Sequence, residues 1–191
     1  PQMLLGVLSV FVLYLLIKKV SNQQMGLWAG FLMAVCPWHI MMSRWGLDAN
    51  LAPAFILFAM YFSVLGLEKE RYLIFAALFW GLSLYTYALT WIFVPVFLAV
   101  SFVYCIVYKK LKYSKYVWIF VLILGLMALP LMLFVAVNKG ILPEITTSYL
   151  SIPKMAEFRS DELAFSGIVE NLRDFLRIYI KQNDMNRMNT I

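Results

Sequence analysis

The chain has 191 residues, of which 63% are hydrophobic and only 14% are charged. Soluble domains are about half apolar and about a quarter charged, so this composition excludes an ordinary soluble enzyme and indicates a membrane protein. The net charge of +6 does not indicate a nucleic-acid partner. Residues 139–191 are neutral, and the excess of Lys and Arg lies mostly in short loops between apolar runs of residues 1–138.

Six apolar segments precede residue 139, and a helix that crosses a bilayer needs about 20 mostly apolar residues. The segments are 3–17, 25–42, 51–67, 72–89, 91–108 and 116–137. The fourth and fifth nearly touch and are together too long for one span, so we expect a tight reversal within residues 85–91. The predicted fold class is an all-α, polytopic transmembrane helical protein with about six spans and an extracytoplasmic helical tail.

Basic residues in the short loops predict the orientation of the spans. Residues 18–19, 69–71 and 109–115 supply Lys and Arg at one end, whereas Arg44 is the only basic residue in the short loops at the other end. The asymmetry predicts a multi-pass protein of the cell (cytoplasmic) membrane with its basic loops in the cytoplasm. Residues 139–191 are then extracytoplasmic.

Two regions follow from this pattern: a transmembrane domain over residues 1–138 and an extracytoplasmic loop region over residues 139–191. Apolar residues recur at helical spacing near residues 167–181, which predicts an amphipathic helix there. Such a helix can lie along the membrane surface or pack against another domain. The sequence leaves both arrangements open.

The stretch CPWHIMMSRWGLDANL (residues 36–51) gathers polar side chains at the predicted outer end of the second span. An unpaired charge at the bilayer centre costs about 2.5–3.5 kcal/mol, so Arg44 and Asp48 are expected at the outer interface, at the mouth of a cavity. Two interpretations stay open. Arg44 and Asp48 could form an ion pair that caps a loop, with His39 an ordinary interfacial histidine, or the cluster could bind a ligand.

The stretch LSLYTYALTW provides a second candidate, because Tyr85 and Tyr87 end the fourth span on the same outer side. These tyrosines either belong to an aromatic belt at the membrane interface or form a hydroxyl-lined wall of the same cavity. The candidate substrate-binding residues are Arg44, His39, Ser43, Asp48, Tyr85 and Tyr87.

Standard catalytic signatures are missing from the sequence. With His39 as the single histidine, no His-based metal pair can form within this chain. No glycine-rich phosphate loop and no Ser-His-Asp set can be argued. We therefore assign no catalytic residue, cofactor or metal ligand to this chain, and the need for a divalent metal stays open.

Several strings together resemble one family. They are PWHIMMSRWG at the close of a span, DANL, GLEKERYL, and GLSLYTY followed by the proline-bearing WIFVPVFLAV. Over roughly residues 3–185 the chain resembles the dolichyl-phosphate-mannose protein mannosyltransferase-like family, the family 39 branch of the GT-C membrane glycosyltransferases. The resemblance implies a polytopic enzyme. Such an enzyme transfers a sugar from a polyprenyl-phosphate carrier to a lipid, glycan or protein on the outer face.

The resemblance also implies roles for particular positions. We expect the chain to be part of a longer protein, and the family's decisive acidic residue then lies in an outer loop upstream of Pro1. His39, Ser43, Arg44 and the two tyrosines would surround the substrate cavity. The guanidinium of Arg44 suits the carrier phosphate because it presents a planar fork of donors.

The implied partners are membrane lipid and a polyprenyl-phosphate sugar donor, with no nucleic acid. The alternative function belongs to another class: a multi-pass transport or scaffold protein of a polysaccharide pathway, without catalytic activity.

Overall fold

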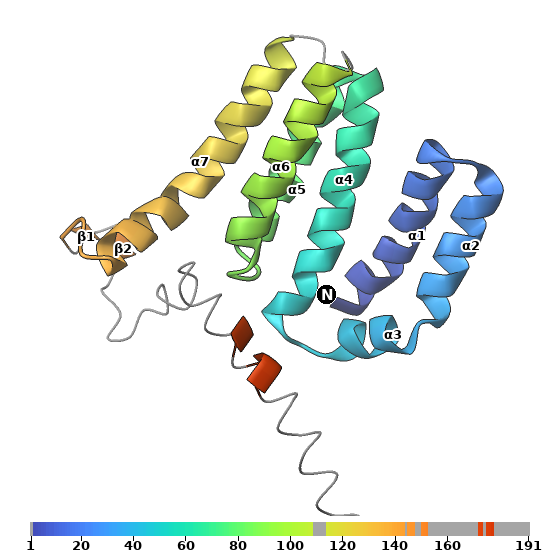
Figure 1. The fold of residues 1–191 in the computed structure, drawn as a ribbon, viewed down its shortest axis with the longest axis horizontal. Coiled ribbons are helices and arrows are strands. Elements are labelled where there is room, and N and C mark those ends of the chain that lie inside the picture. Colours follow the sequence, from blue (N-terminus) through green and yellow to red (C-terminus); the bar gives the residue numbers. More distant parts are fainter. Residues whose placement is uncertain are drawn as a thin grey trace, which may run out of the picture. The chain divides into compact units, whose positions relative to one another are not determined.

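The computed structural model describes residues 2–108, 114–143, 145–147, 150–152, 172–173 and 175–177. The chain forms two compact units, Pro1–Pro130 and Leu131–Ile191. The described α-helices are α1 (Gln2–Val20), α2 (Gln23–Val35), α3 (Pro37–Arg44), α4 (Ala52–Glu68), α5 (Leu73–Leu84), α6 (Thr90–Val107) and α7 (Lys115–Asn138) (Figure 1). The 3₁₀ helices η1 (Asp48–Leu51) and η2 (Glu70–Tyr72) lead into α4 and α5.

The helices of the first unit have the character of membrane spans. In the described residues, four spans are long and apolar enough to cross a bilayer, or five if the bent pair α2–α3 counts as one. Large apolar side chains point outward, such as Trp28 and Trp118, which are 63% and 72% exposed. Outward apolar surface on this scale requires lipid as its solvent. The all-α, polytopic membrane class is therefore confirmed.

The helix α5 is the shortest of the predicted spans. It has 12 residues, fewer than the approximately 20 that cross a bilayer. The predicted reversal after it is confirmed, because α5 ends at Leu84 and α6 begins at Thr90. Thr90 Oγ1 donates to Ser83 O at 2.9 Å, and Trp91 Nε1 donates to Leu84 O at 2.7 Å. These bonds satisfy carbonyls at the end of α5 that lack helical partners.

The predicted second span is not one continuous helix. α2 and α3 meet at a bend of 60°. Cys36 adopts an extended backbone with ψ of 115°, because the residue before a proline is driven out of the helical region and Pro37 has no N–H to donate. The bend brings α3 beneath the N-terminal end of α1 (Figure 1).

Small residues allow α1 and α2 to approach closely. Gly26 and Gly30 are both buried and lie four residues apart on one face of α2. A Cβ atom added to Gly26 would lie 2.8 Å from the carbonyl oxygen of Tyr14 and 3.1 Å from Lys18 Cβ. This spacing is the small-xxx-small arrangement found where helices pack in membranes. Lipid provides no hydrophobic driving force between helices, so close van der Waals contact of the backbones stabilises the pair.

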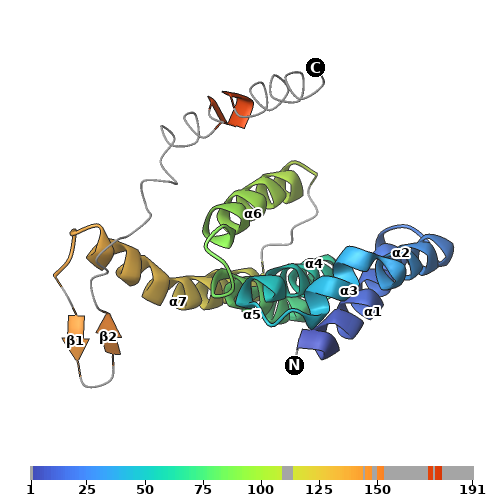
Figure 2. The same ribbon diagram turned by 90° about the horizontal axis from the view of Figure 1, so that it is seen from below.

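Aromatic side chains hold α4, α5 and α6 together. The rings of Phe62 and Phe79 stack with centroids 5.5 Å apart. Trp80 is fully buried, its ring centroid lies 5.3 Å from that of Phe97, and its Nε1 donates to Ser63 Oγ at 3.1 Å. The buried indole thus has the polar partner that it needs. Figure 2 shows that α6 lies off the layer of helices containing α1, α4 and α5.

Contacts at both ends show that α1 and α4 run parallel. Lys19 Nζ lies 2.6 Å from Glu68 Oε2, where both helices end. At the other end, Gln2 Nε2 donates to Leu47 O at 3.0 Å, just before η1. The basic segments 18–19 and 69–71 therefore share one end of the first unit.

The second unit contains a strand pair that the sequence analysis did not predict. Strands β1 (Ile145–Thr147) and β2 (Leu150–Ile152) are antiparallel, with Thr146 opposite Ser151. In the amphipathic helix predicted near residues 167–181, residues 172–173 and 175–177 are helical. The rest of that prediction lies outside the described residues.

Candidate functional site

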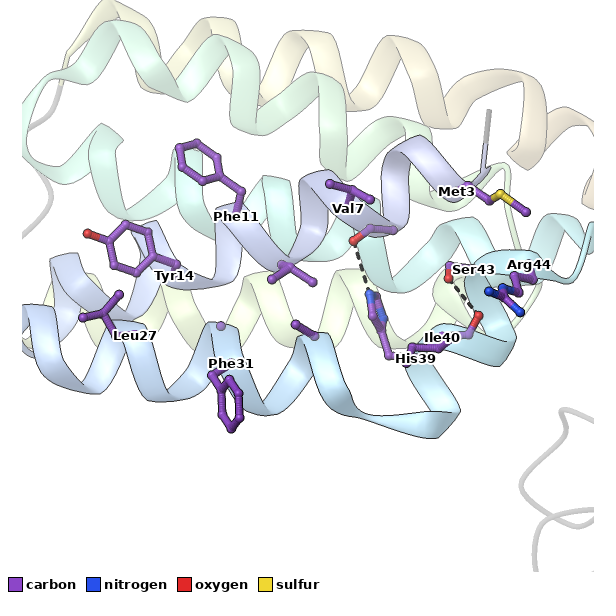
Figure 3. A pocket seen from close by; sticks show the side chains of 14 residues that line it. Met3, Val7, Phe11, Tyr14, Leu27, Phe31, His39, Ile40, Ser43 and Arg44 are labelled. Carbon is purple, nitrogen blue, oxygen red and sulfur yellow. Dashed lines mark hydrogen bonds between the residues drawn. The ribbon is translucent and has the colours of Figure 1, made fainter.

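A groove runs between α1 and α2 and ends at α3 (Figure 3). Its volume is about 670 Å³, within the range of roughly 300–1,000 Å³ that is usual for ligand sites. Apolar side chains of α1 and α2 line most of its length, among them Val7, Phe11, Leu27 and Phe31. At the α3 end the lining residues are His39, Ser43 and Arg44. The groove is therefore apolar along its length and polar at one end.

A second cavity, of about 250 Å³, adjoins the first. Gly6, His39 and Ser43 line both cavities, so they form part of the wall between them. The side chains that line only the smaller cavity include the polar groups of Gln2, Ser9 and Asn50 and the indole of Trp38. The imidazole of His39 and the hydroxyl of Ser43 thus lie where the two cavities meet, and the amides line the smaller cavity.

His39 fixes α3 against α1. Its Nε2 lies 3.2 Å from Gly6 O and 3.5 Å from Ser9 Oγ. Because a carbonyl only accepts, Nε2 carries the proton in the contact with Gly6. Ser9, itself buried, also donates to Gly6 O at 2.7 Å. His39 is therefore a hydrogen-bonded residue whose ring faces both cavities.

At Gly6, α1 and α3 approach each other closely. A Cβ atom there would lie 2.6 Å from Ser43 Cβ, so any larger residue would push α3 away. Ser43 Oγ donates to Ile40 O at 2.9 Å within α3 (Figure 3).

Sequence analysis did not identify the residues of α1 that form this side of the site. The available signal was Ser9, a hydroxyl within an apolar span, with a glycine three residues before it.

Arg44 is the last residue of α3, and Figure 3 shows it beside Ser43 at the polar end of the groove. The structure shows no ion pair between Arg44 and Asp48, and no other described carboxylate lies within pairing distance of Arg44. The helix ends between the two residues, since Trp45 is extended and Asp48 opens η1. The helical i,i+4 geometry is therefore lost, and the Arg44 guanidinium faces solvent.

Asn50 holds the end of α3 in place, a role that sequence analysis did not assign. Its Nδ2 donates to Met42 O at 3.1 Å and to Trp45 O at 2.9 Å. These carbonyls lie at the helix end, where intrahelical partners are missing.

We expect Asn50→Ala to weaken the protein by about 1–3 kcal/mol, since each lost hydrogen bond contributes about 0.5–1.5 kcal/mol. Asn50→Asp should weaken it at least as much, because a carboxylate cannot donate to the two carbonyls. Thermal unfolding of the purified protein in detergent measures the effect. Equal stability of the Asp variant and the wild type would show that the cap contributes nothing.

The turn between α5 and α6, which contains Tyr85 and Tyr87, lies at the same end of the first unit as α3 (Figure 1). Neither tyrosine lines either cavity of the groove. Tyr85 Oη donates to Met127 O at 2.6 Å and so joins the end of α5 to α7. Tyr87 lies in the turn before α6 and is 52% exposed. The structure thus brings together His39, Ser43 and Arg44, and leaves both tyrosines outside their cavity.

The arrangement suits an elongated apolar molecule with an anionic end. Among the described residues, no cluster of three or more His, Cys, Asp or Glu side chains could hold a metal ion. Arg44 is the cation that lines the groove, with the hydroxyl of Ser43 and the imidazole of His39 beside it.

The fold and this groove define a polytopic helical membrane protein with an amphipathic groove. Residues 1–135 match the family model described as dolichyl-phosphate-mannose-protein mannosyltransferase. The match covers more than half of the chain, and the chain belongs to this family. The resemblance seen in the sequence is therefore confirmed over residues 1–135, and the general class is a GT-C membrane glycosyltransferase. No curated protein and no solved structure matches the chain.

Proposed function

We propose that this chain forms the donor-binding part of a glycosyltransferase that takes a sugar from a polyprenyl-phosphate carrier. The observation that supports this function is the groove between α1 and α2, with its apolar length and its cationic end at Arg44. A polyprenyl chain is apolar and its phosphate is anionic. The two parts of the donor therefore match the two parts of the groove.

Arg44 has the chemistry to assist transfer at the phosphate. When the bond between sugar and phosphate breaks, negative charge develops on the leaving phosphate. A guanidinium beside the phosphate stabilises that charge through short, charge-assisted hydrogen bonds. The smaller cavity beyond His39 offers amide and hydroxyl groups for the sugar. The acceptor itself would be a lipid, glycan or protein on the outer face.

A photoreactive polyprenyl phosphate tests the donor site in the full-length protein. We expect cross-links to residues of α1 and α2, and we expect Ala34→Trp to reduce them at least tenfold because Ala34 lines the groove. Val35→Trp is the matched control: Val35 is the next residue on α2, is 51% exposed and does not line the groove. Cross-links confined to other helices would overturn the proposed site. Binding without sugar transfer by the full-length protein would favour the transport or scaffold alternative.

The topology predicts that α3 faces the outside of the cell and that Lys115 lies in the cytoplasm. Single cysteines introduced at Gly46, just after α3, and at Ser114, just before Lys115, test the side of the membrane on which each segment lies. The parent protein for both variants lacks Cys36 and Cys105. An impermeant thiol reagent should label Gly46→Cys in intact cells at least tenfold more than Ser114→Cys. Both should react after permeabilisation. The opposite pattern in intact cells would invert the proposed orientation.

A further inference from the structure

A third cavity lies at the other end of the first unit, among α4, α5, α6 and α7. Its volume is about 360 Å³, and it shares no lining residue with the α1–α2 groove. Apolar side chains from all four helices line it, among them Leu67, Leu73, Leu98, Phe102, Phe120 and Leu124. The proposed donor site makes no use of this cavity.

The lining of the third cavity suits an acyl chain rather than a polar ligand. The hydroxyl of Ser63 is already engaged, since it donates to Ala59 O at 2.7 Å and accepts from Trp80 Nε1 at 3.1 Å. On α7 the cavity is lined from Val117 to Leu124, seven residues further along the helix. At 1.5 Å per residue this depth is about 10 Å. One leaflet of the hydrocarbon core is about 15 Å deep, so the cavity can hold most of one acyl chain.

Exposed cations lie beside the lining residues at the helix ends. Lys69 follows Leu67 by two residues, Arg71 precedes Leu73 by two, and Lys115 precedes Val117 by two. The guanidinium of Arg71 lies 5.4 Å from the ring centroid of Tyr72, and Lys115 Nζ lies 5.5 Å from that of Tyr116. These aromatic contacts limit the freedom of the two cationic side chains.

Acidic side chains at this end do not cancel the positive charge. Glu68 is paired with Lys19 at 2.6 Å, which leaves Glu70 as the other acid of the described loop before α5. Beside the cavity, Lys69, Arg71 and Lys115 therefore outnumber the Glu70 carboxylate and give this end a positive potential. Basic sites between transmembrane helices attract anionic phospholipid headgroups.

We propose that the third cavity binds an anionic phospholipid. One acyl chain inserts among α4, α5, α6 and α7, and the phosphate meets Lys69, Arg71 and Lys115. A free phosphate ion would leave the apolar cavity unfilled, and a zwitterionic lipid would lack the net charge that the cations attract. The occupant is therefore a phosphatidylglycerol-like lipid, bound at the opposite end from the proposed donor phosphate.

Native mass spectrometry of the full-length protein in non-ionic detergent tests the charge requirement. With equal acyl chains, phosphatidylglycerol should be retained at least tenfold better than phosphatidylcholine. Arg71→Gln should weaken this retention about fivefold, and Arg71→Gln with Lys115→Gln about thirtyfold. Lys139→Gln, at the opposite end of α7, is the matched control and should change nothing. Equal retention of both lipids, or an equal loss in the control, would overturn the proposal.

Thiol protection tests the cavity itself without changing its shape. Cys105 lines the third cavity, and Cys36 lines the small cavity beside His39. Phosphatidylglycerol should slow the reaction of N-ethylmaleimide with Cys105 at least fivefold more than phosphatidylcholine does, and leave Cys36 unaffected. Peptide mass spectrometry reads both cysteines in the same molecule. No protection of Cys105, or equal protection of both thiols, would show that the lipid does not occupy this cavity.

Discussion

Replacing Arg44 by alanine should lower sugar transfer by the full-length enzyme about tenfold to a hundredfold. One charge-assisted hydrogen bond contributes about 1.5–3 kcal/mol, and each 1.36 kcal/mol is a factor of ten in rate. Arg44 is exposed at the helix end, and no described carboxylate pairs with it. The loss should therefore appear in turnover of the polyprenyl-phosphate donor and leave membrane insertion intact.

Two further variants separate a ligand contact from a structural role. Arg44→Lys should recover part of the lost rate, because the charge remains but the planar fork of donors does not. Asp48→Ala should change transfer less than threefold, since Asp48 forms no ion pair with Arg44. Sugar-transfer assays with equal amounts of membrane-inserted protein distinguish a ligand contact of Arg44 from a structural role. Normal turnover by Arg44→Ala, or an equal loss in Asp48→Ala, would remove Arg44 from the donor site.

Much of the helical architecture could be predicted from the sequence, because each span must satisfy its own backbone and bury its apolar surface in lipid. The reversal after Leu84 followed from length alone. The break at Pro37 was overlooked, although a proline within an apolar segment is a local signal that the helix can end before it. The strand pair Ile145–Ile152 lies in a region of mixed composition, where no periodic pattern indicated strands.

The site was predictable on one helix and hidden on the other. His39, Ser43 and Arg44 stand out because polar residues are rare in this chain. Gly6 and Ser9 form the opposing wall, but their contact with α3 depends on how helices far apart in sequence pack. A sequence pattern carries that information only weakly. The ion pair that the i,i+4 spacing of Arg44 and Asp48 left open needs a continuous helix, and α3 ends between the two residues.

The packing of α1 on α2 should be sensitive to replacement of Gly26, and these two helices form the long walls of the groove. Gly26 is buried, and a Cβ atom there would lie 2.8 Å from Tyr14 O and 3.1 Å from the backbone nitrogen of Lys18. Both neighbours are backbone atoms, which cannot rotate away as a side chain would. A larger residue must therefore separate the helices.

Gly26→Val should destabilise the protein by about 1–3 kcal/mol, the usual cost of overpacking a filled interface, and should reduce polyprenyl-phosphate cross-linking. Gly125→Val is the matched control: Gly125 lies in the apolar helix α7, and a Cβ atom there meets nothing within 4 Å. That variant should remain within about 0.5 kcal/mol of the wild type. Thermal unfolding in detergent compares the three proteins. If Gly26→Val were as stable as Gly125→Val, the close contact of α1 and α2 would not hold the groove together.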